Sequence, residues 1–293
     1  MTAIQDQVIL VTGSTDGIGK QTAHDLAKMG ATVLLHGRNR ERAEVTLQEI
    51  FAATRSDRLE YYLADFSSLA DVRRLAEAVR SQHCTLNTLI NNAGIGAGHL
   101  TDTQRALSQD GYELRLAVNY LAPFLLTHLL LPCLQHTVPS RIINVASFGQ
   151  QPIDFENVML EQHYDPMQAY CQSKLAGIMF TFDLAEELKN KGITVNCLNP
   201  GSRLNTKMVR EMFGEYRGSV QSGADAIIYV ATSHQLEGVT GKYFDQMQEE
   251  RAIAEGGHSR AIAEGGHGSA IAQAYDTQAR QKLWQLSKSL CNL

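Results

Sequence analysis

Short, continuously apolar segments alternate along this chain with longer segments in which apolar residues recur every three or four positions. Short apolar runs are typical of strands buried on both faces, and the longer pattern is typical of helices with one buried side. Strands are predicted at 8–11, 32–35, 59–63, 88–91, 141–145, 193–198 and 242–244. Helices are predicted at 17–29, 39–53, 69–81, 111–134, 169–191, 224–233 and 278–291.

The alternation of strands and helices predicts the fold class. Each strand–helix–strand unit gives two parallel strands joined by a right-handed crossover, with the helix packed on the sheet. We therefore expect an α/β protein with a Rossmann-type doubly wound sheet of about seven parallel strands and helices on both faces. No linker divides the chain, so residues 1–293 are predicted to form a single domain that closes with a C-terminal helix at 278–291.

A nine-residue repeat interrupts this pattern at 251–277. Residues 251–259 read RAIAEGGHS, residues 260–268 read RAIAEGGHG and residues 269–277 read SAIAQAYDT. Each Gly-Gly pair disfavours a helix, and three short copies do not make a solenoid. The repeat is interpreted as a tandem duplication in a surface loop. His258 and His267 lack a carboxylate or cysteine framework, so no metal site is predicted.

The composition is that of an ordinary globular protein, with 44% hydrophobic and 19% charged residues. A net charge of −5 argues against nucleic acid as a partner. The densest apolar stretch, 121–134, is interrupted by two prolines and a histidine, and no run of 18 apolar residues occurs, so no membrane span is expected. Residues 1–7 are polar and the five cysteines are scattered, which favours a cytoplasmic location.

A glycine-rich turn at 12–19 (TGSTDGIG) follows the first predicted strand and opens the first predicted helix. In this context Gly13 permits a tight turn, while Gly17 and Gly19 let the backbone and the helix N-terminus approach a pyrophosphate. The spacing Gly-x-x-x-Gly-x-Gly differs from the usual dinucleotide-binding spacing, and a plain strand–helix turn is the alternative. The cofactor-binding residues predicted here are Gly13, Ser14, Thr15, Gly17, Ile18 and Gly19.

The end of the second predicted strand bears on the choice between NAD and NADP. An NAD site usually has Asp or Glu here to bind the ribose 2′-hydroxyl, whereas this chain reads HGRNR at 36–40. Arg38 is predicted to bind a 2′-phosphate, with Arg40 or Arg42 assisting, so NADP(H) is expected to be preferred over NAD(H). Asp16 in the glycine turn opposes this assignment, and a solvated helix start is the alternative role of the arginines.

Tyr170 and Lys174 stand four residues apart and therefore share one face of a predicted helix. An ammonium beside a phenol favours the phenolate and lowers the phenol pKa, which brings it nearer the range useful for proton transfer. Such a pair also arises by chance. Its context adds weight, because Ser147 and the NNAG segment at 91–94 end two predicted strands at the carboxyl edge, where α/β proteins bind ligands.

In combination these motifs resemble the short-chain dehydrogenase/reductase family, over about residues 6–250 and again near 270–290, and within it the retinol-dehydrogenase-like branch. The family motifs matched are TGSTDGIG at 12–19, Asp65, NNAG at 91–94, Asn119, Ser147, YCQSK at 170–174 and NPG at 199–201. The branch is matched by GIGKQTA at 17–23, SRIINVAS at 140–147, AYCQSKLA at 169–176, GKYFD at 241–245 and LWQLS at 283–287.

The resemblance implies a single NAD(P)-binding domain that transfers hydride between a nicotinamide ring and an alcohol or carbonyl carbon. It implies that Tyr170 is the general acid/base, that Lys174 lowers its pKa and holds the nicotinamide ribose, and that Ser147 hydrogen-bonds the substrate oxygen. Asn119 is expected to support a proton path near Lys174. Further cofactor contacts are implied for Asp65, Phe66, Asn91, Ala93, Gly94, Tyr170, Lys174, Pro200 and Gly201.

Two features depart from the family pattern. The loop after Pro200 is one residue longer than usual before Thr206, which leaves open whether Thr206 reaches the nicotinamide amide. The membrane-associated members of the branch carry an apolar N-terminal anchor, which residues 1–7 do not resemble, so a membrane-bound retinoid role is not expected.

We therefore expect an NADP-dependent oxidoreductase that interconverts an alcohol and an aldehyde or ketone. The segments 96–110, 148–166 and 203–220 are predicted to form a pocket for a fairly apolar substrate, although a lid helix packing its own apolar face is the alternative. The apolar residues considered are Phe155, Met167, Met208, Met212 and Phe213. The competing function is a dinucleotide-binding sensor or scaffold without turnover. Family analogy implies a homodimer or homotetramer.

Overall fold

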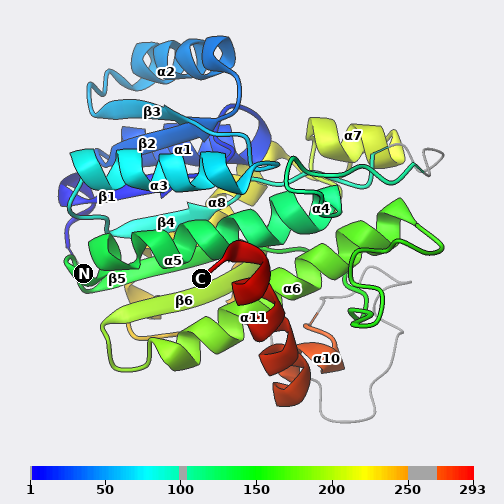
Figure 1. Ribbon diagram of the computed structural model, residues 1–293. Coiled ribbons are helices and arrows are strands. Elements are labelled where there is room, and N and C mark those ends of the chain that lie inside the picture. Colours follow the sequence, from blue (N-terminus) through cyan, green and yellow to red (C-terminus); the bar gives the residue numbers. More distant parts are fainter. Residues whose placement is uncertain (1, 99–103, 250–268) are drawn as a thin grey trace.

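The computed structural model describes residues 2–98, 104–249 and 269–293. Within them one eight-stranded sheet has the order β3-β2-β1-β4-β5-β6-β7-β8 (Figure 1). The strands are β1 (Val8–Val11), β2 (Thr32–Gly37), β3 (Leu59–Leu63), β4 (Thr88–Asn91), β5 (Ser140–Val145), β6 (Ile193–Asn199), β7 (Tyr243–Asp245) and β8 (Gln248–Glu249). Strands β1 to β7 pair in parallel and β8 pairs antiparallel with β7. The predicted Rossmann-type fold is confirmed, with a short edge strand added.

Helices cover both faces of the sheet. One face packs against α1 (Gly17–Lys28), α2 (Arg40–Thr54) and α8 (Val220–Thr232), and the other against α3 (Leu69–Gln82), α5 (Ala122–Gln135) and α6 (Pro166–Glu187). On β1, Ile9 and Val11 enter the first core and Leu10 enters the second, all fully buried. Successive strand side chains point to opposite faces, so burial on both faces explains the continuous apolar runs in the sequence.

Shorter helical segments complete the fold. They are η1 (Ile4–Asp6), α4 (Leu114–Leu116), the π-helical turn η2 (Ala117–Leu121), α7 (Lys207–Phe213), η3 (His234–Leu236), α10 (Ala272–Tyr275) and the C-terminal α11 (Thr277–Cys291). The long helix predicted at 111–134 is therefore divided into α4, η2 and α5. A π-helical turn adds one residue to a helical turn without interrupting the apolar pattern, so the sequence did not reveal this division.

The stretch Leu114–Gln135 is, among the described residues, the one helical segment long and apolar enough to cross a membrane. However, 78% of its most apolar window is buried inside the fold. Its hydrophobicity is explained by its place between the sheet and the neighbouring helices, which is the usual reason for a helix that is apolar on all sides.

Helix α6 begins at Pro166, earlier than the predicted range 169–191. Asp165 caps the helix by accepting the backbone N–H of Gln168 at 2.6 Å, and a proline suits the first helical position because that position needs no N–H donor. The predicted helix 169–191 placed Tyr170 at the start of the helix. In the structure Tyr170 lies in the second turn of α6. Its backbone is held by helical hydrogen bonds on both sides.

Helix α11 packs against α6 and the π-helical turn. The ring of Trp284 lies 5.4 Å from that of Phe124 and 5.9 Å from that of Phe180, measured between centroids. The hydroxyl of Ser287 lies 2.6 Å from that of Tyr120. The last helix of the chain is therefore part of the core on this face (Figure 1).

The repeat at 251–277 is described only in its third copy. Residues 251–268, with His258 and His267, lie outside the described residues. The third copy, 269–277, contains α10 and the first residue of α11, and Ala270 and Ala274 are buried. This copy is thus a packed segment and not the surface loop expected for the repeat as a whole.

Candidate active site

One cleft opens at the carboxyl ends of the strands, where the strand order departs in opposite directions from β1 and β4. Its volume is about 450 Å³. Most of the residues singled out from the sequence line it: Gly13, Thr15, Gly17, Ile18, Gly19, Arg38, Asp65, Phe66, Ala93, Gly94, Ser147, Tyr170, Lys174, Pro200 and Gly201. Segments far apart in the sequence therefore meet at one edge of the sheet.

The glycine turn sits tightly against the segment that follows β4. Gly13 has a φ of +64°, and a Cβ there would lie 2.7 Å from the Cα of Ala93, so only glycine is accommodated. The side-chain amide of Asn92 donates to the carbonyls of Thr12 at 2.9 Å and Gly13 at 3.2 Å. These contacts leave the N-terminus of α1, at Gly17, facing the cleft, where it favours an anion.

The end of β2 presents a cation to the cleft. Arg38 lines the cleft, and the carboxylate of Asp16 is paired with the guanidinium of Arg42 at 3.0 Å. Asp16, whose negative charge would oppose a 2′-phosphate, is thus paired with the positive charge of Arg42. Arg40 bonds to the hydroxyl of Tyr61 at 2.9 Å and is not among the lining residues, so it does not take the assisting position considered for it.

His36, which carries no sequence motif, lines the cleft and joins the ends of three strands. Its Nδ1 accepts the backbone N–H of Gly13 at 3.1 Å, so Nε2 carries the proton and donates to the carbonyl of Ala64 at 3.2 Å. The ring stacks on Phe66 with centroids 4.4 Å apart. Strand pairing alone brings these partners together, which is why no spacing in the sequence marks this histidine.

Burial of His36 predicts a loss of stability in acid. Burial lowers the pKa of His36 from 6.5 to about 4. Between these values the unfolded chain binds a proton here that the folded protein does not, so stability falls as the pH falls, by up to about 3 kcal/mol. His36→Asn keeps a donor and an acceptor but does not titrate. We expect it to flatten the pH dependence of urea unfolding between about pH 7 and 4.5; an unaltered dependence would contradict this assignment.

Ser147, Tyr170 and Lys174 meet at the other end of the cleft. The Nζ of Lys174 lies 5.9 Å from the centroid of the Tyr170 ring and donates to the carbonyl of Val145 at 3.0 Å. The hydroxyl of Ser147 accepts the backbone N–H of Gly149 at 3.0 Å, and its position near Tyr170 favours a lower pKa of that phenol. The shared helix face predicted for Tyr170 and Lys174 is present.

The pKa values at this end of the cleft differ from the sequence expectation. Burial raises the pKa of Tyr170 to about 12, against an opposing effect of the hydrogen bond with Ser147. Burial lowers the pKa of Lys174 to about 8. Burial favours the uncharged form of both groups, and it outweighs the lowering of the phenol pKa that was expected from the neighbouring ammonium. The phenol is therefore protonated at neutral pH.

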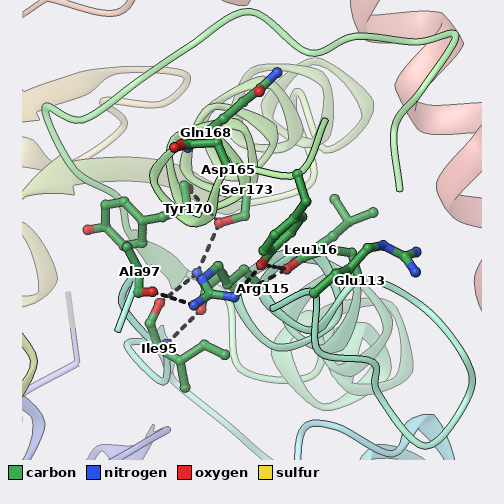
Figure 2. Close-up of polar contacts among 12 residues, drawn as sticks. Ile95, Ala97, Glu113, Arg115, Leu116, Asp165, Gln168, Tyr170 and Ser173 are labelled. Carbon is green, nitrogen blue, oxygen red and sulfur yellow. Dashed lines mark hydrogen bonds and ion pairs between the residues drawn. The ribbon is translucent and has the colours of Figure 1, made fainter. Parts of the chain in front are cut away.

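Asn119 lies beneath the cleft and joins the loop after β4 to helix α6. Its Nδ2 donates to the hydroxyl of Ser173 at 2.9 Å and to the carbonyl of Ile95 at 3.0 Å, and its Oδ1 accepts the N–H of Ile95 at 2.8 Å. The hydroxyl of Ser173 in turn donates to the carbonyl of Tyr170 at 2.7 Å (Figure 2). Through Ser173, these bonds connect Asn119 to the backbone of Tyr170 in the second turn of α6.

Two residues predicted to bind the cofactor, Ser14 and Asn91, are not among those that line the cleft. The hydroxyl of Ser14 accepts the N–H of His36 at 2.8 Å. The side-chain amide of Asn91 donates to Thr127 at 3.0 Å and to Asn144 at 2.8 Å. Both side chains are occupied in joining neighbouring elements: Ser14 of the glycine turn bonds to β2, and Asn91 of β4 bonds to α5 and β5.

Two buried residues, Glu113 and Arg115 (Figure 2), form a cluster with the half-buried Tyr164 that supports the loop after β4. The sequence did not indicate this cluster. The guanidinium of Arg115 lies 3.5 Å from the carboxylate of Glu113 and donates to the hydroxyl of Tyr164 at 2.6 Å. It also donates to the carbonyls of Gly96 at 3.0 Å and Ala97 at 2.5 Å. Glu113 is 1% exposed, so its carboxylate depends on these partners in place of water.

Helix α7 rests on the supported loop. Met208 and Met212 press on Gly96, where a Cβ would lie 2.6 Å from the sulfur of Met212. Thr206 caps α7 by accepting the N–H of Val209 at 3.2 Å, and it lines the cleft. The longer loop after Pro200 therefore still brings Thr206 to the cleft.

A glycine turn at the crossover edge of a doubly wound sheet is where such sheets bind dinucleotides, and this places the protein in the broad class of dinucleotide-dependent Rossmann-fold proteins. The sequence model of the short chain dehydrogenase family matches residues 7–217. Retinol dehydrogenase 13 of Mus musculus is 35% identical over 308 residues, which cover 99% of this chain and 85% of that protein.

Solved structures are similar as well. A protein from Mycobacterium paratuberculosis has a TM-score of 0.74 at 27% identity, over 98% of this chain and 94% of that chain. An active-site complex of Pseudomonas aeruginosa RhlG with NADP has a TM-score of 0.68 at 27% identity, over 84% and 97%. The chain belongs to the short-chain dehydrogenase/reductase family, as a retinol-dehydrogenase-like NAD(P)-dependent dehydrogenase/reductase.

Proposed function

We propose that this protein is an NADP-dependent oxidoreductase that interconverts an alcohol and an aldehyde or ketone, with a fairly apolar substrate. One observation carries the proposal: a single cleft is continuous from Arg38 at one end to Ser147, Tyr170 and Lys174 at the other. A cleft of this kind suits a ligand with a phosphate-bearing adenosine at one end and a reactive ring at the other.

The residues at the Arg38 end suit NADP(H). The glycine turn offers backbone N–H groups and a helix N-terminus to the pyrophosphate, and Arg38 offers a cation where an NAD site usually has an acid. Asp65 and Phe66 line the same end and would contact the adenine. The NADP complex of the structural relative RhlG supports this choice of cofactor.

When bound, the nicotinamide supplies a hydride to the substrate carbon or accepts one from it. The chain's own residues would handle the oxygen and the proton. The hydroxyl of Ser147 would hydrogen-bond the substrate oxygen, and Tyr170 would donate a proton to that oxygen in reduction or remove one in oxidation. The ammonium of Lys174 would stabilise the phenolate. Tyr170 is protonated at neutral pH, which is the form that would donate a proton to a carbonyl oxygen.

The lining at the substrate end supports an apolar substrate. The apolar residues there are Ile95, Leu114, Val118, Leu204, Met208 and Val209. Phe155 and Phe213, which the sequence suggested for the pocket, are instead placed near surface cations: each ring centroid lies 5.0 Å from one, Lys282 and Arg203 respectively. Thioethers and aliphatic side chains adapt to different apolar shapes, which suits a flexible carbonyl substrate.

We also propose a cytoplasmic location and a homo-oligomeric state. The five cysteines are free thiols, and four are buried, which supports a reducing compartment such as the cytoplasm. Family analogy supports a homodimer or homotetramer.

The test of the proposed function is a fluorescence titration of the purified protein with NADPH and with NADH, followed by a panel of aldehydes and ketones assayed by loss of reduced-cofactor absorbance. We expect tighter binding of NADPH and turnover of apolar carbonyl compounds. Tight binding without turnover on any compound would favour a sensor or scaffold. Failure to bind either dinucleotide would overturn the proposal.

Arg38→Ala is expected to weaken NADPH binding by roughly 10–100-fold and to change NADH binding little, because a charge-assisted hydrogen bond to the 2′-phosphate contributes about 1.5–3 kcal/mol. The measurement is the dissociation constant of each cofactor. Arg40→Ala is the matched control, since Arg40 is an exposed arginine on the same segment that does not line the cleft. An equal loss of affinity for both cofactors would remove Arg38 from the 2′-phosphate site.

A further inference from the structure

Two segments more than a hundred residues apart in the sequence are joined by hydrogen bonds next to Ser147. One is the loop 147–153 that follows β5, and the other is the segment 269–275, which belongs to the third copy of the repeat and precedes α11. Helix α10 of the second segment packs on α6, the helix that carries Tyr170 (Figure 1). The connection between the two segments is made by two glutamines, Gln150 and Gln273.

Gln150 uses both ends of its amide. Its Nε2 lies 3.3 Å from the carbonyl of Ser147 and 3.4 Å from that of Ser269, and its Oε1 accepts the N–H of Ile271 at 3.0 Å. The side chain is nearly buried, with 6% of the residue exposed. Because a buried amide that loses a partner carries a desolvation cost, this set of bonds defines the position of Gln150 between the two segments.

Gln273 makes the reciprocal contact. Its Oε1 accepts the N–H of Ile153 at 2.6 Å and its Nε2 donates to the carbonyl of Ile153 at 3.1 Å. A side-chain amide that pairs with both backbone groups of one residue reproduces the pairing between two strands. The ring of Tyr275 stacks on Phe182 of α6 with centroids 5.3 Å apart, which seats the segment against α6.

Three hydrogen bonds hold Ser147 as a result, two at its backbone carbonyl and one at its hydroxyl. Its carbonyl faces the donors of Gln150 and of the Tyr243 hydroxyl, the latter at 3.2 Å. Its hydroxyl accepts the N–H of Gly149. A hydroxyl has one proton to donate, so this acceptance leaves that proton for Tyr170 or a substrate oxygen. The direction of that donor depends on the backbone that Gln150 holds.

We propose that Gln150 is a positioning residue that aims the Ser147 hydroxyl, and that the segment 269–275, clasped by Gln273, keeps Gln150 in place. The C-terminal segment thereby sets the geometry of proton transfer without touching the substrate. This inference rests on the proposed function, since it concerns the efficiency of that reaction.

The position of the Ser147 hydroxyl also affects the pH dependence of the reaction, which a purely structural role of Gln150 would not. The hydrogen bond with Ser147 lowers the pKa of Tyr170 against the effect of burial. A misdirected Ser147 would let that pKa rise, and alcohol oxidation, which needs the phenolate, would shift to higher pH. Among the residues that the structure describes, the other titratable groups beside Tyr170 are Lys174 and Cys171 on α6. The loop after β4 and α7 face Tyr170 with Ala97 and Met212.

Gln150→Leu in the full-length protein is the first test. We expect kcat to fall roughly tenfold, because small displacements of a reacting group have effects of this order. NADPH affinity is expected to be unchanged, and the pH profile of alcohol oxidation is expected to move to higher pH. Wild-type kcat and an unmoved profile would overturn the proposal.

Gln273→Leu is the second test, because it releases the segment without removing any bond of Gln150. We expect a smaller fall in kcat and a profile shift in the same direction; wild-type behaviour would overturn the role of the segment. Gln151→Leu is the matched control, an exposed glutamine beside Gln150, and should behave as wild type. If the wild-type protein turns over no carbonyl compound, the proposed function fails; if it does and both variants match it, this inference alone fails.

Discussion

Tyr170→Phe is expected to lower turnover by roughly 10²–10⁴-fold while leaving NADPH affinity close to that of the wild type, because it removes the proton donor and nothing else from the cleft. The buried ring would stay in its place among Ala97, Cys171 and Met212, so the protein should fold normally. The hydroxyl that would give its proton to the substrate oxygen is lost. The measurement is kcat with NADPH and a carbonyl substrate, together with the cofactor dissociation constant.

The matched control is Tyr216→Phe, which removes a phenolic hydroxyl from a tyrosine that is 53% exposed. It should retain wild-type kcat. Undiminished turnover in Tyr170→Phe would exclude Tyr170 as the general acid and would require another proton donor at the cleft. Loss of turnover together with loss of NADPH binding would instead mean that the substitution disturbs the cleft as a whole.

Arg115→Met is expected to lower the free energy of unfolding by about 3 kcal/mol, because it leaves Glu113 buried without its cation. It also removes the donors to the carbonyls of Gly96 and Ala97, which face the cleft wall on which α7 rests. We therefore expect KM for the carbonyl substrate to rise, since the loop that carries the apolar wall is no longer held. Urea unfolding and steady-state kinetics measure the two effects.

A double variant separates the buried charge from the lost hydrogen bonds. Adding Glu113→Gln to Arg115→Met removes the negative charge of the carboxylate. The glutamine keeps an oxygen that can accept the N–H of Leu116, which Glu113 Oε2 accepts at 2.7 Å in the wild type. Stability should recover in part, because the uncompensated charge is gone, whereas the raised KM should remain. A double variant less stable than Arg115→Met would show that the two residues do not stabilise each other through their charges.

The strands, the glycine turn and the shared face of Tyr170 and Lys174 could be predicted because each is a local property. A strand buried on both faces must be continuously apolar, a turn that presses on Ala93 must have glycine at Gly13, and two residues four apart on a helix must share a side. These requirements act within a few residues, so they are visible as patterns. The resemblance to the family additionally indicated which of these segments come together at the cleft.

The early start of α6 and the π-helical turn were not predicted because the apolar pattern does not mark them. Asp165 and Pro166 signal a helix start, but they lie in a polar loop where such residues are also common. Likewise, Ser14 and Asn91 belong to motifs at the cleft, yet their side chains bond to residues of neighbouring elements that the sequence pattern does not reveal.

By itself the sequence determined the sheet, the place of the cleft at its carboxyl edge and the residues proposed for the reaction, because these follow from periodicity, glycine conformation and motif spacing. Only the tertiary structure decided how those groups are supported. His36 joins three strand ends, Arg115 holds the loop after β4, and Gln150 joins Ser147 to the C-terminal segment. It also decided the pKa of Tyr170, since burial depends on every element packed around the ring. Such contacts are made between residues distant in the chain, and their partners become neighbours only when the sheet and its helices assemble.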